Sequence, residues 1–157
     1  MNHVLTDELR FPAISGHVRI SRLRDQCVLS DGPNLVLQNA LEVMAFALLG
    51  QDSIRYISFG KTGKPVTPGM TTVGSPVAQI LLGDTGDTLP FVTRDSGGLR
   101  SIVTWAGLYT PIAPVTYDTL GLVSTTGGLF SAYATAETTL GAGETISVQW
   151  TIALRGI

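Results

Sequence analysis

The clearest pattern in the sequence is a strict alternation of apolar and small polar residues near the C-terminus. It covers residues 146–154, where apolar side chains take every second position. A period of two predicts a β-strand with one face on a core. Further apolar runs predict strands over 54–59, 77–82, 99–109, 117–123 and 129–135. Glycine-rich turn signals separate several of these runs, as at 97–98, 127–128 and 141–143. The order predicts an antiparallel β-sandwich or jelly-roll-like domain, mainly β, rather than a crossover-linked parallel sheet.

One helix is predicted between the first strand and the later strands. Residues 31–34 have the composition of a turn and helix start, with the Asn34 side chain as the N-cap. Apolar residues then recur at helical spacing over about 35–49, interrupted by a narrow polar stripe. Gly50 is the expected left-handed cap at the end of the helix. We therefore expect one buried α-helix over about 35–49.

Residues 1–30 differ from the rest of the chain in their charge. They hold four arginines that are candidate inter-subunit contacts, namely Arg10, Arg19, Arg22 and Arg24. The charged residues of 101–154, in contrast, are all acidic. We interpret 1–30 as an extended N-terminal arm plus a first strand, and 31–157 as a single β-rich domain. The charge difference predicts docking of the arm on a neighbouring subunit, and a solvated terminal strand explains it equally well.

Composition indicates a covered surface. Charged side chains make up 14% of the 157 residues, whereas an average soluble domain carries about 25%. So little charge predicts that copies of the chain or other partners cover part of the surface. The formal net charge of -2 provides no basic field for nucleic acid. The best apolar stretch is shorter than the roughly 20 residues that span a bilayer, and the first residues lack the layout of a secretory signal. We expect neither a nucleic-acid nor a membrane partner.

Residues suited to catalysis are scarce in this chain. His3 and His17 lie outside any nucleophile motif. Cys27 lies in an apolar run, which predicts a buried structural cysteine. Residues 60–62 imitate the end of a phosphate-binding loop, but Arg55 stands where that loop needs a glycine. We therefore predict no catalytic residue, no metal or cofactor and no small-molecule substrate.

A short motif leaves one enzymatic alternative open. Asp84-Thr85-Gly86 follows the apolar residues 80–82. In aspartic proteases this motif supplies one of two catalytic carboxylates, and a homodimer can supply both. The residues on either side of the motif depart from that pattern, and a polar loop explains the same sequence. A homodimeric aspartic protease that uses Asp84 is the distant alternative.

The order of several segments along residues 31–154 is characteristic of a known group of proteins. They are Asn34-Leu35 at the predicted helix start, then 57–63, 120–123, 128–132 and 144–154. This order resembles small virion structural proteins of tailed bacteriophages, of the tail-fibre, neck or baseplate-attachment type. The resemblance implies a non-enzymatic virion protein that is made in the host bacterial cytoplasm. It also implies copies of itself, in a ring or trimer, and other virion proteins as partners.

Two parts of the chain are additions to the pattern of that family. They are the loop from Asp84 to Gly98 and the basic N-terminal arm. Variable loops commonly specify partners, so we expect arm and loop to dock the protein on the tail, neck or fibre-attachment region. A capsid decoration protein, which also clamps neighbours with extended arms, is the alternative within the structural class.

Overall fold

The computed structural model describes residues 14–83, 90–94, 97–98 and 100–155, which form nine strands and one helix. The strands are β1 (Ile14–Arg22), β2 (Val28–Val36), β3 (Ile54–Lys61), β4 (Ser75–Leu81), β5 (Phe91–Arg94), β6 (Arg100–Tyr109), β7 (Val115–Ser124), β8 (Leu129–Leu140) and β9 (Ile146–Arg155). The helix, α1 (Ala40–Leu48), lies between β2 and β3. Neighbouring strands pair antiparallel in the order β4-β3-β7-β8-β2-β1-β9-β6-β5.

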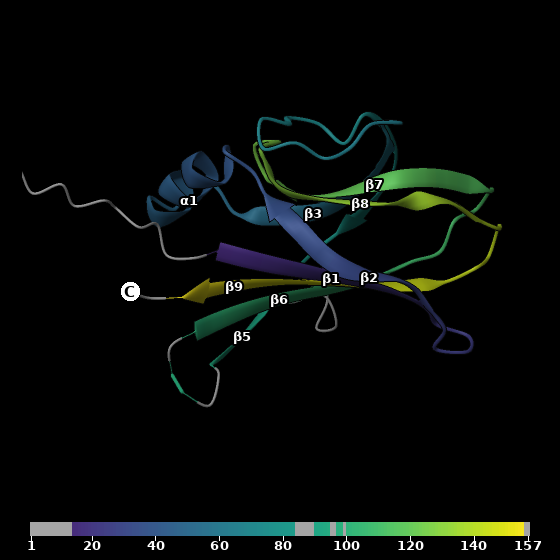
Figure 1. Ribbon diagram of the computed structural model, residues 1–157, viewed down its shortest axis with the longest axis horizontal. Coiled ribbons are helices and arrows are strands. Elements are labelled where there is room, and N and C mark those ends of the chain that lie inside the picture. The colour runs from purple at the N-terminus through teal and green to yellow at the C-terminus, as the bar shows by residue number, and fades with distance from the viewer. Residues whose placement is uncertain (1–13, 84–89, 95–96, 99, 156–157) are drawn as a thin grey trace, which may run out of the picture.

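The sheet curls into a half-barrel, so that its two halves face each other across a common core (Figure 1). Strand β2 joins the halves, because it pairs with β1 as far as Asn34 and with β8 at Leu35 and Val36. The prediction of a mainly β, antiparallel, sandwich-like fold with one helix is confirmed. The short strand β5 is an element that the sequence pattern did not predict.

The core lies between the two halves of the sheet. Val148 and Trp150 of β9 are fully buried, while Gln149 between them is exposed, which confirms the alternation seen in the sequence. Trp150 is paired in register with Trp105 of β6. Large aromatic side chains provide much of the apolar area that stabilises such a core.

A second apolar cluster lies under the loop 62–74, which connects β3 and β4. Val73 of this loop is buried with Leu129 of β8. A Cβ atom at Gly60 would lie 2.1 Å from the carbonyl oxygen of Val73, and one at Gly121 would lie 2.5 Å from its Cγ1. Both distances are too short for any real contact, so glycine at these two positions lets the loop lie flat on the sheet.

The helix is present, but its extent and burial differ from the prediction. It begins at Ala40 rather than at about residue 35, because residues 31–34 continue strand β2. The Asn34 side chain does not cap the helix; its Nδ2 donates a hydrogen bond to Ser131 Oγ on β8, 3.2 Å away. Of the helical residues, Ala40 and Val43 are buried. Gly50 adopts the predicted left-handed conformation, with φ 69°.

Strand β1 lies inside the sheet rather than at its edge. It pairs with β2 on one side and with β9 on the other, from Ile14 opposite Leu154 to Arg22 opposite Ile146. Residues 1–13, the N-terminal segment, lie outside the described residues, so the predicted extended arm stays a prediction. Strand β2 runs through residue 30, where the two predicted regions meet.

We call the end of the half-barrel where β1 begins and β9 ends the α1 end, because α1 lies beside it (Figure 1). It holds Ile14 and Leu154. The opposite end holds the turn between β1 and β2 and the loop between β8 and β9. The two ends present different chemistry.

Candidate functional site

The described residues do not form a cluster of metal-ligating side chains. Among them, no group of three or more His, Cys, Asp or Glu residues could hold a metal ion. His17 is exposed on β1 and hydrogen-bonds to Asp31 of β2. Cys27 is exposed in the turn between β1 and β2, so the prediction of a buried cysteine was wrong. Asp84 lies outside the described residues, and the protease alternative therefore stays a prediction.

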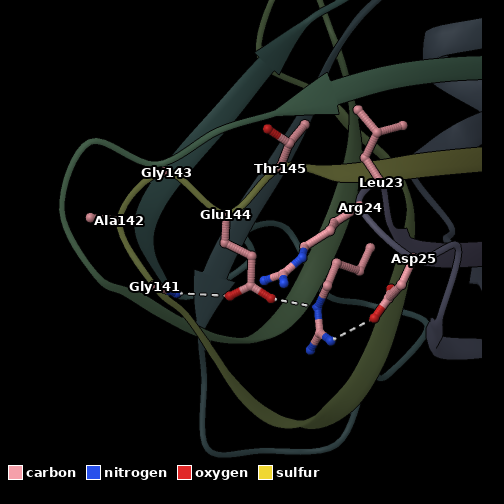
Figure 2. A pocket seen from close by; sticks show the side chains of 9 residues that line it. Leu23, Arg24, Asp25, Gly141, Ala142, Gly143, Glu144 and Thr145 are labelled. Carbon is pink, nitrogen blue, oxygen red and sulfur yellow. Dashed lines mark hydrogen bonds and ion pairs between the residues drawn. The ribbon is translucent and has the colours of Figure 1, made fainter.

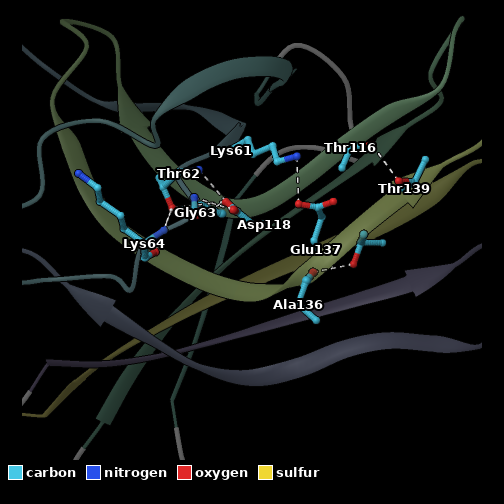
Figure 3. A network of polar contacts seen from close by, with 11 residues as sticks. Lys61, Thr62, Gly63, Lys64, Thr116, Asp118, Ala136, Glu137 and Thr139 are labelled. Carbon is cyan, nitrogen blue, oxygen red and sulfur yellow. Dashed lines mark hydrogen bonds and ion pairs between the residues drawn. The ribbon is translucent and has the colours of Figure 1, made fainter.

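The segment that imitates a phosphate-binding loop ends strand β3. Lys61 Nζ forms an ion pair with Glu137 Oε2 of β8, 3.0 Å away. The next residues turn away from the sheet, and hydrogen bonds to Asp118 on β7 hold this turn in place (Figure 3). Its carboxylate accepts hydrogen bonds from the backbone N–H groups of Thr62 and Gly63, each at 2.8 Å.

Asp118 is held as a carboxylate by these donors. Burial favours its neutral form, but the hydrogen bonds from Thr62, Gly63 and Thr119 outweigh it and hold the pKa of Asp118 below its usual value. An acid that is ionised and already saturated with donors fixes a loop and is unsuited to proton transfer. Beside it, loop 62–74 and the start of β4 line a groove of about 860 Å³ that contains Lys61, Lys64 and several threonines.

Asp52 is a second partly buried acid with a structural role. It lies after α1, and its carboxylate accepts hydrogen bonds from Thr126 Oγ1 at 2.7 Å and from the Ser53 backbone N–H at 2.9 Å. Burial acts to raise the pKa of Asp52, but these bonds and one from Ser124 act in the opposite direction and together outweigh it, so the pKa is lowered. Asp52 thereby ties the end of the helix to the turn between β7 and β8.

The four predicted arginines fall into different settings. Arg10 lies outside the described residues. Arg22, at the end of β1, is engaged within its own chain: its Nε donates to Glu144 Oε1 at 2.7 Å and its Nη1 to Asp25 Oδ2 at 3.2 Å (Figure 2). Arg19 and Arg24 are exposed. They, rather than Arg22, remain available as inter-subunit contacts.

The ion pairs around Arg22 organise the opposite end of the half-barrel. Glu144 also accepts a hydrogen bond from the Gly141 backbone N–H at 3.1 Å. This bond, followed by the one from Arg22, lowers the pKa of Glu144. The pKa of Asp25 is lowered first by the Cys27 backbone N–H and also by Arg22. The resulting pocket of about 650 Å³ is open and charged, and both of its walls are turns of the chain.

The α1 end has the opposite character. Helix α1 is apolar except for Glu42, yet most of it faces solvent: Leu48 is 89% exposed and Leu49, just after the helix, is 70% exposed. Leu41 and Phe46 are exposed as well. We call Leu41, Phe46, Leu48 and Leu49 the α1 patch. The helical spacing of these apolar residues predicted that they lie in the core of their own chain, and that prediction was wrong.

The two outer strands of the sheet also carry exposed apolar residues. Val77 and Leu81 on β4, and Phe91 and Val92 on β5, are exposed, with Val92 at 66%. Within the described residues each of these strands has a partner on one side only. An edge of this kind can pair with another chain through its backbone groups.

Comparison with known proteins adds no relative. No family model, no curated protein and no solved structure matches this chain. No described helix has the length and apolar character needed to cross a bilayer.

Proposed function

We propose that the protein is a non-enzymatic structural protein that assembles with copies of itself. The α1 patch carries this proposal. Scattered exposed apolar residues are common on proteins, but three on one short helix with a single charge, and a fourth directly after it, form a candidate interface. Interfaces of permanent assemblies are more apolar than transient ones, and the low overall charge of the chain favours such a permanent contact.

We further propose that the assembly belongs to the virion of a tailed bacteriophage and lies on the tail, neck or fibre-attachment region. The order of segments along residues 31–154 supports this placement through its resemblance to such proteins. The unpaired sides of β4 and β5 provide further surfaces through which copies in a ring or trimer, or other virion proteins, can attach. Arg19 on β1 and Arg24 in the turn after it are exposed, and they can contribute charged contacts to such components away from the α1 patch.

The mass of the purified protein in solution tests the assembly. We expect light scattering to report a multimer at micromolar concentration. A stable, well-dispersed monomer over the whole accessible concentration range would refute the proposal.

The position in the particle needs a separate experiment. A label on the protein, imaged on purified particles, should appear at the tail or neck; a label spread over the head would favour the capsid decoration alternative. The companion variant should lack residues 1–13 only, because residues 14–22 form a central strand whose loss would unfold the sheet. If that truncated chain no longer enters particles, the N-terminal segment carries the docking contact.

The protease alternative is tested by hydrolysis of an unfolded protein substrate. We expect no activity from the parent protein. Hydrolysis that is lost in Asp84→Asn would instead support the protease and overturn the non-enzymatic role.

A further inference from the structure

Three arginines lie on neighbouring strands at the α1 end of the sheet (Figure 1). Arg155, the last residue of β9, is paired in register with Arg100, the first residue of β6. Arg94, the last residue of β5, lies opposite Ser101, which follows Arg100. All three arginines are exposed, and we call them the basic edge. Like charges directly opposite each other in a sheet are unfavourable, so the basic edge favours an acidic group beside it.

The α1 end also carries a single acid that lacks a partner. Glu42 is the one charged residue of α1. Its side chain forms no hydrogen bond or ion pair with another described residue, and the same is true of the Arg94 and Arg155 side chains. At the opposite end, in contrast, Arg22 is paired within its own chain. Opposite charges at the α1 end are therefore available for a contact between copies.

Glu42 shares a face of α1 with two exposed apolar residues. Positions i, i+4 and i+7 lie on one face of a helix, and Glu42, Phe46 and Leu49 have this spacing. All three are exposed, and Leu49 directly follows the helix with its backbone still in the right-handed helical region. The buried residues Ala40 and Val43 lie on the other face. We call Glu42, Phe46 and Leu49 the α1 stripe, and anchors at this spacing are typical of helices that dock in apolar grooves.

An apolar pocket of about 180 Å³ lies beside the basic edge. Its lining side chains are all apolar and come from α1, β3, β6, β8 and β9. One of them is Leu154, which directly precedes Arg155, so the pocket and the basic edge adjoin. Apolar cavities of about 150 Å³ accept benzene-sized molecules. The pocket therefore has room for a leucine side chain, which is smaller than benzene.

The α1 stripe complements this surface in charge and in spacing, but only on a second copy. Within its own chain, α1 lines the pocket with Val43, Met44 and Ala47, and Leu49 lies on the other face of the helix. Along the helix axis, Glu42 and Leu49 are separated by about 10 Å, at a rise of about 1.5 Å per residue. When Leu49 covers the pocket of a second copy, Glu42 is thus one arginine side chain away from the rim where Arg155 begins.

We infer that α1 of one copy docks on the β6–β9 end of a second copy, with Glu42 paired to Arg155 and Leu49 against the apolar pocket of that second copy. The inference rests on the proposed self-association and names the contact that provides it. Stripe and acceptor are different surfaces of the same chain, so repetition of the contact around an axis closes a ring.

Charge reversal on each side of the contact tests this pairing. Sedimentation equilibrium should show that Glu42→Arg and Arg155→Glu each raise the dissociation constant by at least about tenfold, because each variant places like charges together. The double variant Glu42→Arg/Arg155→Glu restores opposite charges, and we expect it to associate more tightly than either single variant. Leu49→Gln should also weaken association by about tenfold, since an apolar contact is lost.

Two controls separate the contact from net charge. Glu137→Arg changes the net charge as Glu42→Arg does, but Glu137 lies near the end of β8, towards the opposite end of the half-barrel. It should associate like the parent. Glu42→Arg/Lys64→Glu restores the net charge at an exposed residue of the loop between β3 and β4, and it should stay as weak as Glu42→Arg. Circular dichroism verifies that every variant is folded.

Several results would overturn the inference. A parent that associates while neither reversal weakens it would leave the proposed assembly intact and assign the basic edge to an acidic segment of another component. A double variant no tighter than the single variants, or equal rescue by Lys64→Glu, would show that Glu42 and Arg155 do not meet. Unchanged association of Leu49→Gln would exclude the pocket as its acceptor. A parent that stays monomeric would refute the proposed assembly together with this contact.

Discussion

Replacing the two most exposed leucines at the α1 end separates association from folding. In Leu48→Gln/Leu49→Gln both side chains keep much of their size and helix propensity but become polar. Because Leu48 is 89% and Leu49 70% exposed, neither contributes much to the fold of one chain. We expect the free energy of unfolding of the isolated chain to change by no more than about 0.5 kcal/mol.

The same change should strongly weaken association. Full burial of a leucine stabilises by about 1.5–3 kcal/mol, so two leucines that are largely exposed in one chain and covered in an assembly provide roughly 3–4 kcal/mol. Every 1.4 kcal/mol is a factor of ten. The dissociation constant should therefore rise by roughly two to three orders of magnitude.

Sedimentation equilibrium over a concentration series measures this constant, and circular dichroism checks the fold. The matched control is Leu108→Gln: Leu108 is 53% exposed but lies on β6 at the opposite end, paired with Ser147 of β9. We expect the control to associate like the parent. A double variant that associates as tightly as the parent, or a control that weakens association as much as the double variant, would refute an interface at the α1 patch.

Two further predictions concern the fold, and a third concerns the position of the interface. Gly121→Ala should lower the free energy of unfolding by about 1–3 kcal/mol, because its Cβ would lie 2.5 Å from Val73 Cγ1; urea denaturation should show a near-neutral effect for the control Gly141→Ala, whose Cβ has no neighbour closer than 3.8 Å. The pKa of Asp118 is lowered from 3.8 in the folded state, so its contribution to stability is present above that value and is lost as the pH falls below it. Unfolding measured between pH 6 and about pH 2.5 should show this loss, and Asp118→Asn should flatten the slope. Cys27 is exposed at the end of the half-barrel away from α1, so a water-soluble maleimide should label it in the native protein and in the assembly; protection only in the assembly would place the interface at that end.

The strands that the sequence predicted well are those whose pattern is imposed by the core. In β9 every second side chain faces the interior, so the alternation over 146–154 was sufficient to identify it. Strands β3, β4 and β6 to β8 were predicted from apolar runs, and their observed ends differ from the predicted ones by five residues at most. Strand β5, with four exposed residues, has no such pattern to detect.

Strand β2 was not predicted over its second half, because local sequence signals indicated a turn and a helix start there. Gly32 and Pro33 favour a turn, yet both lie in a strand that pairs with β1. Proline is tolerated in a strand with one unpaired side, and β2 meets β8 only from Leu35 onward. The pairing partners come from residues 14–22 and 129–140, and contacts between such distant segments outweigh the local turn signal. The start of α1 shifted for the same reason.

The α1 patch could not be predicted from the sequence for a related reason. Periodicity shows that residues 35–49 are apolar, but it does not show what covers them. A half-barrel with an open end can bury only one side of a short helix, and Ala40 and Val43 take that side. Apolar character that is sufficient for a fully buried helix thus remains on the surface. The low charge of the chain was the one signal that pointed to covered surface somewhere.

The two ends of the half-barrel divide this chain by chemistry, which limits how copies can be arranged. At the end away from α1, charged side chains pair within the same chain: Arg22 forms ion pairs with Asp25 and with Glu144. These paired groups offer little to a partner and are screened by salt, whereas Arg24 at the same end is exposed. The α1 end combines exposed leucines with an apolar pocket lined by α1 and strands of both halves of the sheet. Association through the α1 end therefore covers the surface that is most costly to hydrate and leaves the opposite end facing outward, free to meet other components of an assembly.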